Sequence, residues 1–409
     1  MINYISSVPE TGLSWPRSVA IMGSTGSIGV NTLAVMAANP GRFTASALAA
    51  GRNAPLLAEQ AAVWRPPHLA VQDDTTRKTL EEHLAPLKTK GYAPKIHVGP
   101  EGYAYLASLP EADIVVSAQV GAAGLAATHA AVVAGKTVAL ANKESLVLAG
   151  DILRMEAVIH GSVILPVDSE HNAIFQCLVQ CLTGTAGKSV SKLLLTASGG
   201  PFRGKDAAFV ENATPEQALR HPNWSMGAKI TIDSASMMNK GLEVIEACHL
   251  YGIAPEDIVV LLHPQSLVHS LVQFSDASVL AQIGPPDMRV AISHCLGWPE
   301  RIENSVAPLD LTAAAALTFE KPDTGVFRCL ALARDALAAG KGMPVALNAG
   351  NEIAVDAFLA RRISFGGIAR LVAAVMDAFA AKNMGTPATL EEIMEYDRQA
   401  RLLAIEALP

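Results

Sequence analysis

The sequence predicts an α/β protein whose chain ends in a helical bundle. Short apolar runs alternate with helical segments up to residue 165, a pattern typical of a mostly parallel sheet with helices on both faces. From Pro166 onward strands, helices and polar loops are mixed, which predicts an α+β domain with an open sheet. After about residue 325 only helical periodicity remains. With 409 residues, the chain is long enough for two or three domains.

In the first part, the apolar run Ser18–Met22 predicts a strand, and a helix is expected from about Ser27 to Ala38. That helix stops before Asn39-Pro40-Gly41, because proline and glycine end helices. Further apolar runs predict strands at Phe43–Ala50, Leu69–Val71, Ile96–Val98, Ile114–Ser117, Val138–Ala141 and Val163–Val167.

In the second part, a helix is expected at His171–Leu182 and a strand at Leu193–Thr196. Residues 201–228 are polar and are expected to form an irregular, mobile loop. Antiparallel strands are expected at Leu267–Phe274 and Ser278–Ile283, and helices at about 325–340, 344–361, 366–381 and 388–407. The predicted divisions are an arm (1–17), an α/β domain (18–165), an α+β domain (166–297) with a flap at about 198–228, a linker (298–324) and a helical domain (325–409).

Composition and charge exclude several classes of protein. The net charge of −7 and the lack of a Lys/Arg cluster argue against nucleic-acid binding. The first residues lack the pattern of a secretory signal, and charged residues interrupt the apolar stretch Ile114–Gly150, which argues against a membrane span. Five scattered cysteines indicate reduced thiols and a cytoplasmic setting. Cys177 and Cys181, four residues apart, are interpreted as core residues rather than a metal or redox pair.

A glycine-rich turn lies between the first strand and the first helix. Gly23, Gly26 and Gly29 have the spacing G-x-x-G-x-x-G, and Ser24, Thr25 and Ser27 add hydroxyl groups. Such a turn lets the backbone approach a pyrophosphate at a helix N-terminus, so a Rossmann-like nucleotide domain is expected. The spacing differs from the usual G-x-G-x-x-G, and a tight turn without a ligand is the alternative.

The end of the second strand favours NADP over NAD. NAD sites usually place an acid there, whereas this strand ends in Ala50-Gly51-Arg52-Asn53. Arg52 could pair with a 2′-phosphate, although it could also be an ordinary surface charge. Asn142, Lys143 and Glu144 follow another strand end on the same side of the sheet, which favours contact with the cofactor or substrate over a helix-start ion pair.

Three acids form a candidate metal site. Asp168 and Glu170 follow an apolar strand, no basic residue in their segment neutralises them, and Glu243 occurs in DSASMMNKGLE. Carboxylates that converge repel one another unless a cation joins them, and oxygen ligands favour Mg²⁺ or Mn²⁺ over zinc. The alternative is three unrelated surface acids, with Glu243 a solvated helix residue beside Lys240.

Small polar residues near these acids form a candidate phosphate site. The turn at Ser198 has exposed amide groups, and Ser234, Asn239 and Lys240 lie near an expected helix start. His221 and Trp224, in the loop, could close over a ligand and exclude water. Helix capping and ordinary packing are the alternatives for these residues.

Several long motifs occur along the chain in the order GSTGSIG, GAAGL, LANKESLV, LPVDSEHNAIFQ, ASGGPF, HPNWSMG, DSASMMNKGLE, HPQS and PDMR. In content and order they resemble the 1-deoxy-D-xylulose 5-phosphate reductoisomerase family over nearly all of the chain after residue 17. ALNAGNE is the best match among the C-terminal helices. The chain departs from the usual pattern at Ala197, Pro285 and Arg52, where relatives often have Gly, Glu and Lys.

This resemblance implies an enzyme of non-mevalonate isoprenoid biosynthesis that isomerises 1-deoxy-D-xylulose 5-phosphate and reduces it to 2-C-methyl-D-erythritol 4-phosphate. It implies NADPH, a divalent cation (Mg²⁺ or Mn²⁺, with Co²⁺ a further candidate) and a V-shaped homodimer. Asp168, Glu170 and Glu243 would bind the metal, Ser169 and Lys143 the substrate hydroxyls, and Ser198, Ser234, Asn239, Lys240 and His221 the phosphate. Trp224 and Met226 would belong to the flap, and NADPH would contact Thr25, Ser27, Ile28, Arg52, Asn53, Asn142 and Glu144.

Two other functions remain open at this stage. A metal-independent NADP dehydrogenase acting on an aldehyde would use the glycine-rich turn without the three acids. A non-catalytic NADP-sensing module would use the C-terminal helices as a partner-binding platform. The density of candidate ligands between residues 166 and 243 disfavours the second alternative.

Overall fold

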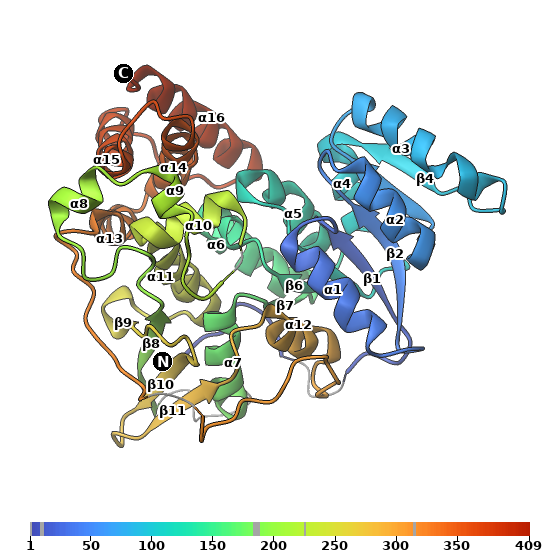
Figure 1. Cartoon of the computed structure of the whole chain (residues 1–409), viewed down its shortest axis with the longest axis horizontal. Coiled ribbons are helices and arrows are strands. Elements are labelled where there is room, and N and C mark those ends of the chain that lie inside the picture. Colours follow the sequence, from blue (N-terminus) through green and yellow to red (C-terminus); the bar gives the residue numbers. More distant parts are fainter. Residues whose placement is uncertain (1, 9–11, 183–188, 225, 314–315) are drawn as a thin grey trace.

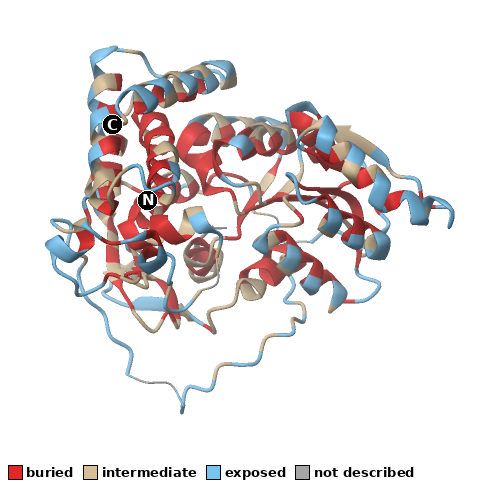
Figure 2. Cartoon of the chain, turned by 45° about the horizontal axis from the view of Figure 1, so that its top comes forward, coloured by how far each residue is buried: buried red, intermediate tan, exposed pale blue. Residues whose placement is uncertain are grey.

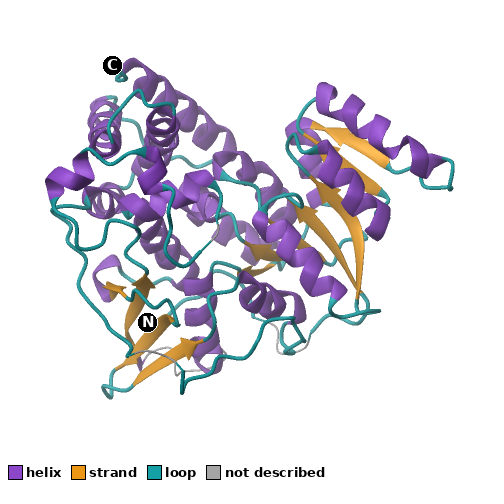
Figure 3. Ribbon diagram, viewed as in Figure 1, coloured by secondary structure: helices purple, strands orange, loops and turns teal. Residues whose placement is uncertain are grey.

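The computed structural model describes residues 2–8, 12–182, 189–224, 226–313 and 316–409. Within these residues, seven parallel strands form one sheet in the order β4-β3-β2-β1-β5-β6-β7 (Figures 1 and 3). The strands are β1 (Arg17–Met22), β2 (Phe43–Ala49), β3 (His68–Val71), β4 (Lys95–Val98), β5 (Ile114–Ser117), β6 (Thr137–Leu140) and β7 (Val163–Pro166). The strands predicted for this part of the chain are confirmed. Strand order reverses between β1 and β5, and ligands of such sheets bind at this point, beyond the carboxyl ends of the strands.

Helices connect these strands, and several begin at a residue that caps them. Asn53, Asp73 and Asn142 each accept a backbone N–H bond at the start of the helix that follows. The helices are α1 (Ser27–Ala37), α2 (Ala54–Trp64), α3 (Asp74–Lys88), α4 (Gly99–Ala107), the short 3₁₀ helix η1 (Gly121–Gly124), α5 (Leu125–Val133) and α6 (Lys143–His160). Figure 2 shows that buried residues follow the sheet and the inner faces of these helices.

A second sheet has the order β11-β10-β8-β9 within the described residues. Its strands are β8 (Val190–Ala197), β9 (Ile258–Leu262), β10 (Val268–Phe274) and β11 (Val279–Ile283). The predicted antiparallel pair β10 and β11 is confirmed. β9, which pairs in parallel with β8, was missed in the sequence interpretation. The helices α7 (Ser169–Leu182) and α11 (Met238–Tyr251) pack against this sheet, and α10 (Ala228–Ser236) packs against α11.

The expectation that residues 201–228 are wholly irregular was wrong. Two short helices, α8 (Ala207–Glu211) and α9 (Pro215–Ala218), occur there. Their sequence signals are local: Asp206 accepts from the backbone N–H of Phe209, and Thr214 and Gln217 form a capping box. The tip of the loop around His221–Trp224 carries no helix.

The helix α12 (Met288–Gly297) belongs to the predicted 166–297 segment, yet it packs on α1. Ile292 and Leu296 share a buried cluster with Val19 and Ile21 of β1. The chain therefore returns to the first sheet after building the second. The predicted domain boundaries stay a prediction.

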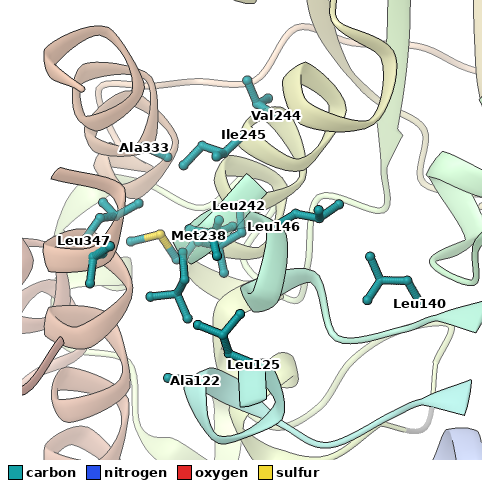
Figure 4. Close-up of a cluster of buried hydrophobic side chains, with 14 of the residues drawn as sticks. Ala122, Leu125, Leu140, Leu146, Met238, Leu242, Val244, Ile245, Ala333 and Leu347 are labelled. Atoms are coloured by element: carbon teal, nitrogen blue, oxygen red, sulfur yellow. The ribbon is translucent and has the colours of Figure 1, made fainter. Parts of the chain in front are cut away.

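The C-terminal region is helical, as predicted, with α13 (Arg328–Ala339), α14 (Met343–Leu359), α15 (Phe365–Ala381) and α16 (Leu390–Glu406). α14 packs against α15, α16 and α6. Figure 4 shows apolar side chains from these parts meeting in one cluster, among them Leu146 of α6, Leu242 of α11 and Leu347 of α14. This shared core holds the C-terminal helices against both sheet-bearing parts.

Two smaller expectations concern thiols and membranes. Cys177 packs against the core, and burial raises the pKa of its thiol to about 11, which agrees with a core role. The side chain of Cys181 lies outside the described residues. None of the helices in the described ranges has both the length and the apolar character needed to cross a membrane.

Candidate active site

A cavity of about 480 Å³ opens between the carboxyl ends of strands of the first sheet and residues of β8 and β10 of the second sheet. The turn after β1 lines one side, and the loop after β5 lies next to it. Further walls come from α6, α7, α10, α11, β8 and β10, and from His221, Trp224 and residues 226–229. Of the predicted site residues, these line the cavity: Gly26, Ser27, Ile28, Lys143, Glu144, Asp168, Ser169, Glu170, Ser198, His221, Trp224, Ser234, Asn239 and Lys240.

The three predicted metal ligands converge. One carboxylate oxygen from each of Asp168, Glu170 and Glu243 lies within 4.8 Å of the other two. Asp168 follows β7, Glu170 lies in the first turn of α7, and Glu243 projects from α11 with its side chain fully buried. Three carboxylates this close, all oxygen donors, fit the ligand preference of Mg²⁺ or Mn²⁺.

Two buried lysines from outside the Asp168–Glu170 segment neutralise part of this negative charge. Lys143 Nζ contacts Asp168 and lies 3.3 Å from Glu243 Oε1. Lys240 Nζ lies 2.8 Å from Glu170 Oε1 and also contacts Glu243. Lys143 begins α6 and Lys240 lies in the first turn of α11, so the fold supplies charges that the acids' own segment lacks.

The same contacts shift the pKa values of the acids in opposite directions. Burial and the nearby Glu170 carboxylate raise the pKa of Glu243 to about 7, although Lys240 and Lys143 oppose this. Burial also disfavours charge on Glu170, but the ammonium of Lys240 outweighs it and lowers the pKa of that carboxyl. If all five groups are ionised, three negative and two positive charges leave a net charge of −1, which suits a cation.

The predicted phosphate site is organised around a bond between Ser198 and His221. Ser198 Oγ lies 3.0 Å from His221 Nε2. The backbone N–H groups of Asn223 and Trp224 donate to His221 Nδ1 at 3.2 and 3.0 Å, so Nδ1 is the acceptor and Nε2 carries the proton. Burial lowers the pKa of His221, with Glu170 opposing, so the neutral ring donates from Nε2.

Two glycines bring this turn against α10. Gly199 and Gly200 have positive φ values of 83° and 66°, which glycine adopts without a steric penalty. A Cβ on Gly200 would lie 2.8 Å from Ser234 O. The turn can therefore approach α10 closely, which places Ser198 and Ser234 in one wall of the cavity.

On the nucleotide side, packing explains two of the three glycines. A Cβ on Gly23 would lie 2.5 Å from Ala118 O, and one on Gly29 would lie 2.4 Å from Gly23 O. Gly26 precedes α1 and has no such close contact; it lines the cavity with Ser27 and Ile28. This leaves the N-terminus of α1 open to an anionic group.

Other predicted cofactor residues lie outside the cavity wall. Ser24 is buried, and its carbonyl accepts from Gln60. Arg52 is largely exposed, with Nε 3.5 Å from Asp73 Oδ2. Asn53 caps α2 and Asn142 caps α6. The remaining ones, Gly23, Thr25 and Gly51, belong to the two strand-end turns. Their contacts with a cofactor stay a prediction.

Sequence reasoning missed Lys229 and Asp233, which line the cavity from α10. Lys229 Nζ lies 2.8 Å from both Glu144 Oε1 and Asp233 Oδ2. Their i,i+4 spacing was the available signal, because residues so spaced face the same side of a helix. The alternative of a helix-start ion pair between Lys143 and Glu144 is not observed; each bonds to a different partner.

Comparisons with known proteins agree with this geometry. Profiles described as 1-deoxy-D-xylulose 5-phosphate reductoisomerase match residues 19–150 and, for its C-terminal domain, 164–251, and one described as DXP reductoisomerase C-terminal domain matches 283–403. Relatives of that name from Oleidesulfovibrio alaskensis and Cellvibrio japonicus are 54% and 49% identical, over 98% and 96% of this chain and 97% and 98% of theirs.

Solved structures show the same likeness. A structure described as DOX-P reductoisomerase in complex with NADPH, fosmidomycin and magnesium is 44% identical, with a TM-score of 0.90 over 95% of this chain and 98% of that one. The enzyme from Zymomonas mobilis, in complex with NADPH, is 43% identical, with a TM-score of 0.87 over 96% and 99%. On these matches, the chain belongs to the 1-deoxy-D-xylulose 5-phosphate reductoisomerase family.

Proposed function

We propose that this protein converts 1-deoxy-D-xylulose 5-phosphate to 2-C-methyl-D-erythritol 4-phosphate, using NADPH and a divalent cation, in non-mevalonate isoprenoid biosynthesis. One observation carries the proposal: three carboxylates converge, and two of them, Asp168 and Glu170, line the same cavity as the open N-terminus of α1. That arrangement suits a reaction that needs both a metal and a nucleotide. The ligands named for the similar solved structures support the same pair of cofactors.

Asp168, Glu170 and Glu243 would hold the cation. Bound there, the cation would polarise the carbonyl and hydroxyl oxygens of the substrate, and NADPH would supply the hydride. Lys143 would donate from Nζ to a substrate hydroxyl, because Asn239 Oδ1 at 2.8 Å and Asp168 fix its position. Ser169 would assist from the first turn of α7, where its Oγ lies 2.6 Å from Glu170 Oε2.

The phosphate would bind beside the metal ligands, where Lys240 contacts both Glu170 and Glu243. His221 would donate from Nε2, and Ser198, Ser234, Asn239 and Lys240 would supply the remaining donors. Anchoring the phosphate fixes the far end of the substrate, so that the reacting carbons meet the metal in one orientation. Trp224 and Met226, also in the cavity wall, would exclude water while the aldehyde intermediate awaits reduction.

The nucleotide would lie across the switch point between β1 and β5, with its pyrophosphate at Gly26–Ile28. Arg52, at the end of β2, would pair with the 2′-phosphate. Its exposed guanidinium is already near the carboxylate of Asp73, so the 2′-phosphate would compete with that contact.

An NADPH-oxidation assay with purified protein and 1-deoxy-D-xylulose 5-phosphate tests the proposal. We expect the absorbance of NADPH to fall only when substrate is present, the rate to be abolished by EDTA, and Mg²⁺ or Mn²⁺ to restore it. Activity that survives EDTA would indicate a metal-independent dehydrogenase. NADPH binding without any substrate-dependent oxidation would indicate a sensing module.

We also propose a cytoplasmic homodimer. The exposed side chains of Val279, Leu280 and Ile283 on the edge strand β11 support the dimer, because an uncovered apolar edge favours association with a second copy. The four described cysteines, all free, are compatible with a reducing compartment. Light scattering of the purified protein at several concentrations tests the dimer.

A further inference from the structure

The loop after β5, residues 118–122, is held by the C-terminal helical region. Glu352 of α14 accepts a hydrogen bond through Oε1 from the backbone N–H of Ala122 at 3.1 Å. The loop fits tightly around this carboxylate: Gly121 has φ +73°, and a Cβ there would lie 2.6 Å from Glu352 Oε1. A residue more than two hundred positions away in sequence therefore touches the loop directly.

Glu352 is itself fixed within the helical region. Its Oε1 also accepts from Asn348 Nδ2 at 3.1 Å, and its Oε2 lies 2.5 Å from Arg401 Nη2 of α16. Arg401 is oriented in turn by Asp397, 2.7 Å from its Nε. The carboxylate thus reaches the loop from a rigid support of two packed helices rather than from a mobile side chain.

Asn142 holds the opposite side of the loop. Its Nδ2 donates to the carbonyls of Gln119 and Gly121 at 2.7 and 3.0 Å. Its Oδ1 accepts from the backbone N–H of Ser145 at the start of α6. Glu352 of α14 and Asn142 at the start of α6 therefore hold the same turn of backbone by hydrogen bonds.

A second chain of polar contacts joins these two anchors along the cavity wall. Asn351, the neighbour of Glu352, donates to Asp233 Oδ1 at 2.8 Å. Asp233 pairs with Lys229, and Lys229 pairs with Glu144, each at 2.8 Å. Glu144 Oε2 in turn accepts from Asn142 Nδ2 at 3.1 Å.

The contacts thus close into a ring that runs from α14 through α10 and α6 to the loop and back to α14. Its charges alternate. Burial disfavours the charge on Glu144, but the ammonium of Lys229 outweighs it and lowers the pKa of that carboxyl. The charged members of the ring are therefore paired with one another, whereas the buried amide oxygen of Asn351 has no hydrogen-bond partner within the described residues.

The loop 118–122 lies where a dinucleotide would cross the sheet. Ala118, Gln119 and Val120 line the cavity directly after β5, beside the turn after β1. Gln119 Oε1 is buried and accepts no hydrogen bond within the part of the chain that the structure describes. A buried amide oxygen without a donor calls for a ligand or water to satisfy it.

We propose that Glu352 is a positioning residue for NADPH: it acts through the backbone of Gly121–Ala122 to set the cofactor-facing loop 118–120. This inference rests on the proposed function, since it assumes that NADPH is the nucleotide. It gives the C-terminal helical region a role in cofactor affinity. Within the described residues, the hydrogen bonds and ion pairs of Glu352 go to Ala122, Asn348 and Arg401, none of which is a proposed metal or substrate group, so substrate and metal affinity should depend less on this contact.

Glu352→Ala tests the proposal, with Glu395→Ala as a matched control. Glu395 is a half-exposed carboxylate on α16 that also pairs with an arginine, Arg398, but does not contact the loop. NADPH binding is measured by the fluorescence of the bound nucleotide, without substrate or metal. We expect Glu352→Ala to raise the Kd for NADPH about tenfold, because the loop loses roughly one good buried hydrogen bond. Glu395→Ala should leave the Kd unchanged.

Steady-state kinetics and melting distinguish positioning from general damage. At saturating NADPH, the KM for 1-deoxy-D-xylulose 5-phosphate of Glu352→Ala should stay within about threefold of the parent value, an energy difference under 1 kcal/mol. Glu352→Gln, which keeps an acceptor for the Ala122 N–H, should recover most of the NADPH affinity. An unchanged Kd in folded Glu352→Ala, or a substrate KM that rises as much as the Kd, overturns the inference.

Gly121→Ala approaches the same contact from the loop side and covers the case in which Glu352→Ala fails to fold. The added methyl group would meet the carboxylate of Glu352, so the loop must shift, and the Kd for NADPH should rise here too. A Gly121→Ala protein with the parent Kd would contradict the proposal. Absence of NADPH binding by the parent protein would instead refute the proposed function.

Discussion

His171 Nε2 lies 3.0 Å from Glu246 Oε2, and both side chains are fully buried. His171 follows Glu170 in α7, and Glu246 lies one helical turn after Glu243 in α11. Burial disfavours a charged imidazole, but Glu246 outweighs it and raises the pKa of His171. This ion pair joins the two helices that carry two of the three proposed metal ligands.

Glu246→Ala should therefore weaken both stability and metal binding. Removing one member of a buried pair typically costs about 3–5 kcal/mol, and separation of α7 from α11 would move Glu170 and Glu243 apart. Urea denaturation and Mg²⁺ titration of activity measure the two effects. Glu256→Ala, at an exposed position just after α11, is the control. Unaltered stability would show that the pair contributes nothing.

Glu243→Gln should lower turnover while leaving NADPH binding nearly intact. Gln keeps the size of the side chain but removes the charge that a divalent cation needs, so kcat should fall at least about a hundredfold. NADPH affinity should persist because Glu243 contacts Lys143, Asn239 and Lys240 rather than the glycine turn. Parent-like turnover at saturating metal would exclude a ligand role for Glu243.

His221→Gln should raise the KM for substrate. The amide of Gln can still donate near the position of Nε2, but it loses the acceptor that orders the backbone of Asn223 and Trp224. Loss of about 1 kcal/mol in flap closure predicts a KM roughly fivefold higher, with a smaller change in kcat. Steady-state kinetics with varied substrate check this, and the Kd for NADPH is the internal control.

Stability should fall in mild acid because of His294. Burial, with a smaller contribution from Arg301, lowers the pKa of His294 to about 4 in the folded protein, against about 6.5 when unfolded. A depressed pKa means that the unfolded state takes up the proton first. The neutral ring of His294 therefore contributes its full share of the unfolding free energy above about pH 6.5. This share, up to roughly 3 kcal/mol, is lost as the pH falls towards 4.

Urea denaturation between pH 7 and pH 4.5 measures this contribution as a difference between variants. His294→Gln should flatten the decline in unfolding free energy over that range. His83→Gln, at an exposed position on α3, should follow the parent protein. Parallel curves for parent and His294→Gln would contradict the prediction.

The sequence by itself determined the elements whose signals are local. The alternation of β1 to β7 with helices, the turn at Gly23–Gly29 and the C-terminal helices follow from apolar periodicity, capping residues and glycine, all properties of neighbouring residues. The small helices α8 and α9 also had local signals, in Asp206 and Thr214, but the polar character of the loop concealed them.

Tertiary structure alone decided which charges meet. Asp168 and Glu243 belong to different elements, and only the packing of α7 on the second sheet and of α11 on α6 brings them together. The same packing brings Lys143 and Lys240 into contact with the acids. The hydrogen bond of Glu352 to Ala122 depends in the same way on the packing of α14 against α6. Interaction between charges depends on distance in space, and sequence separation does not fix that distance.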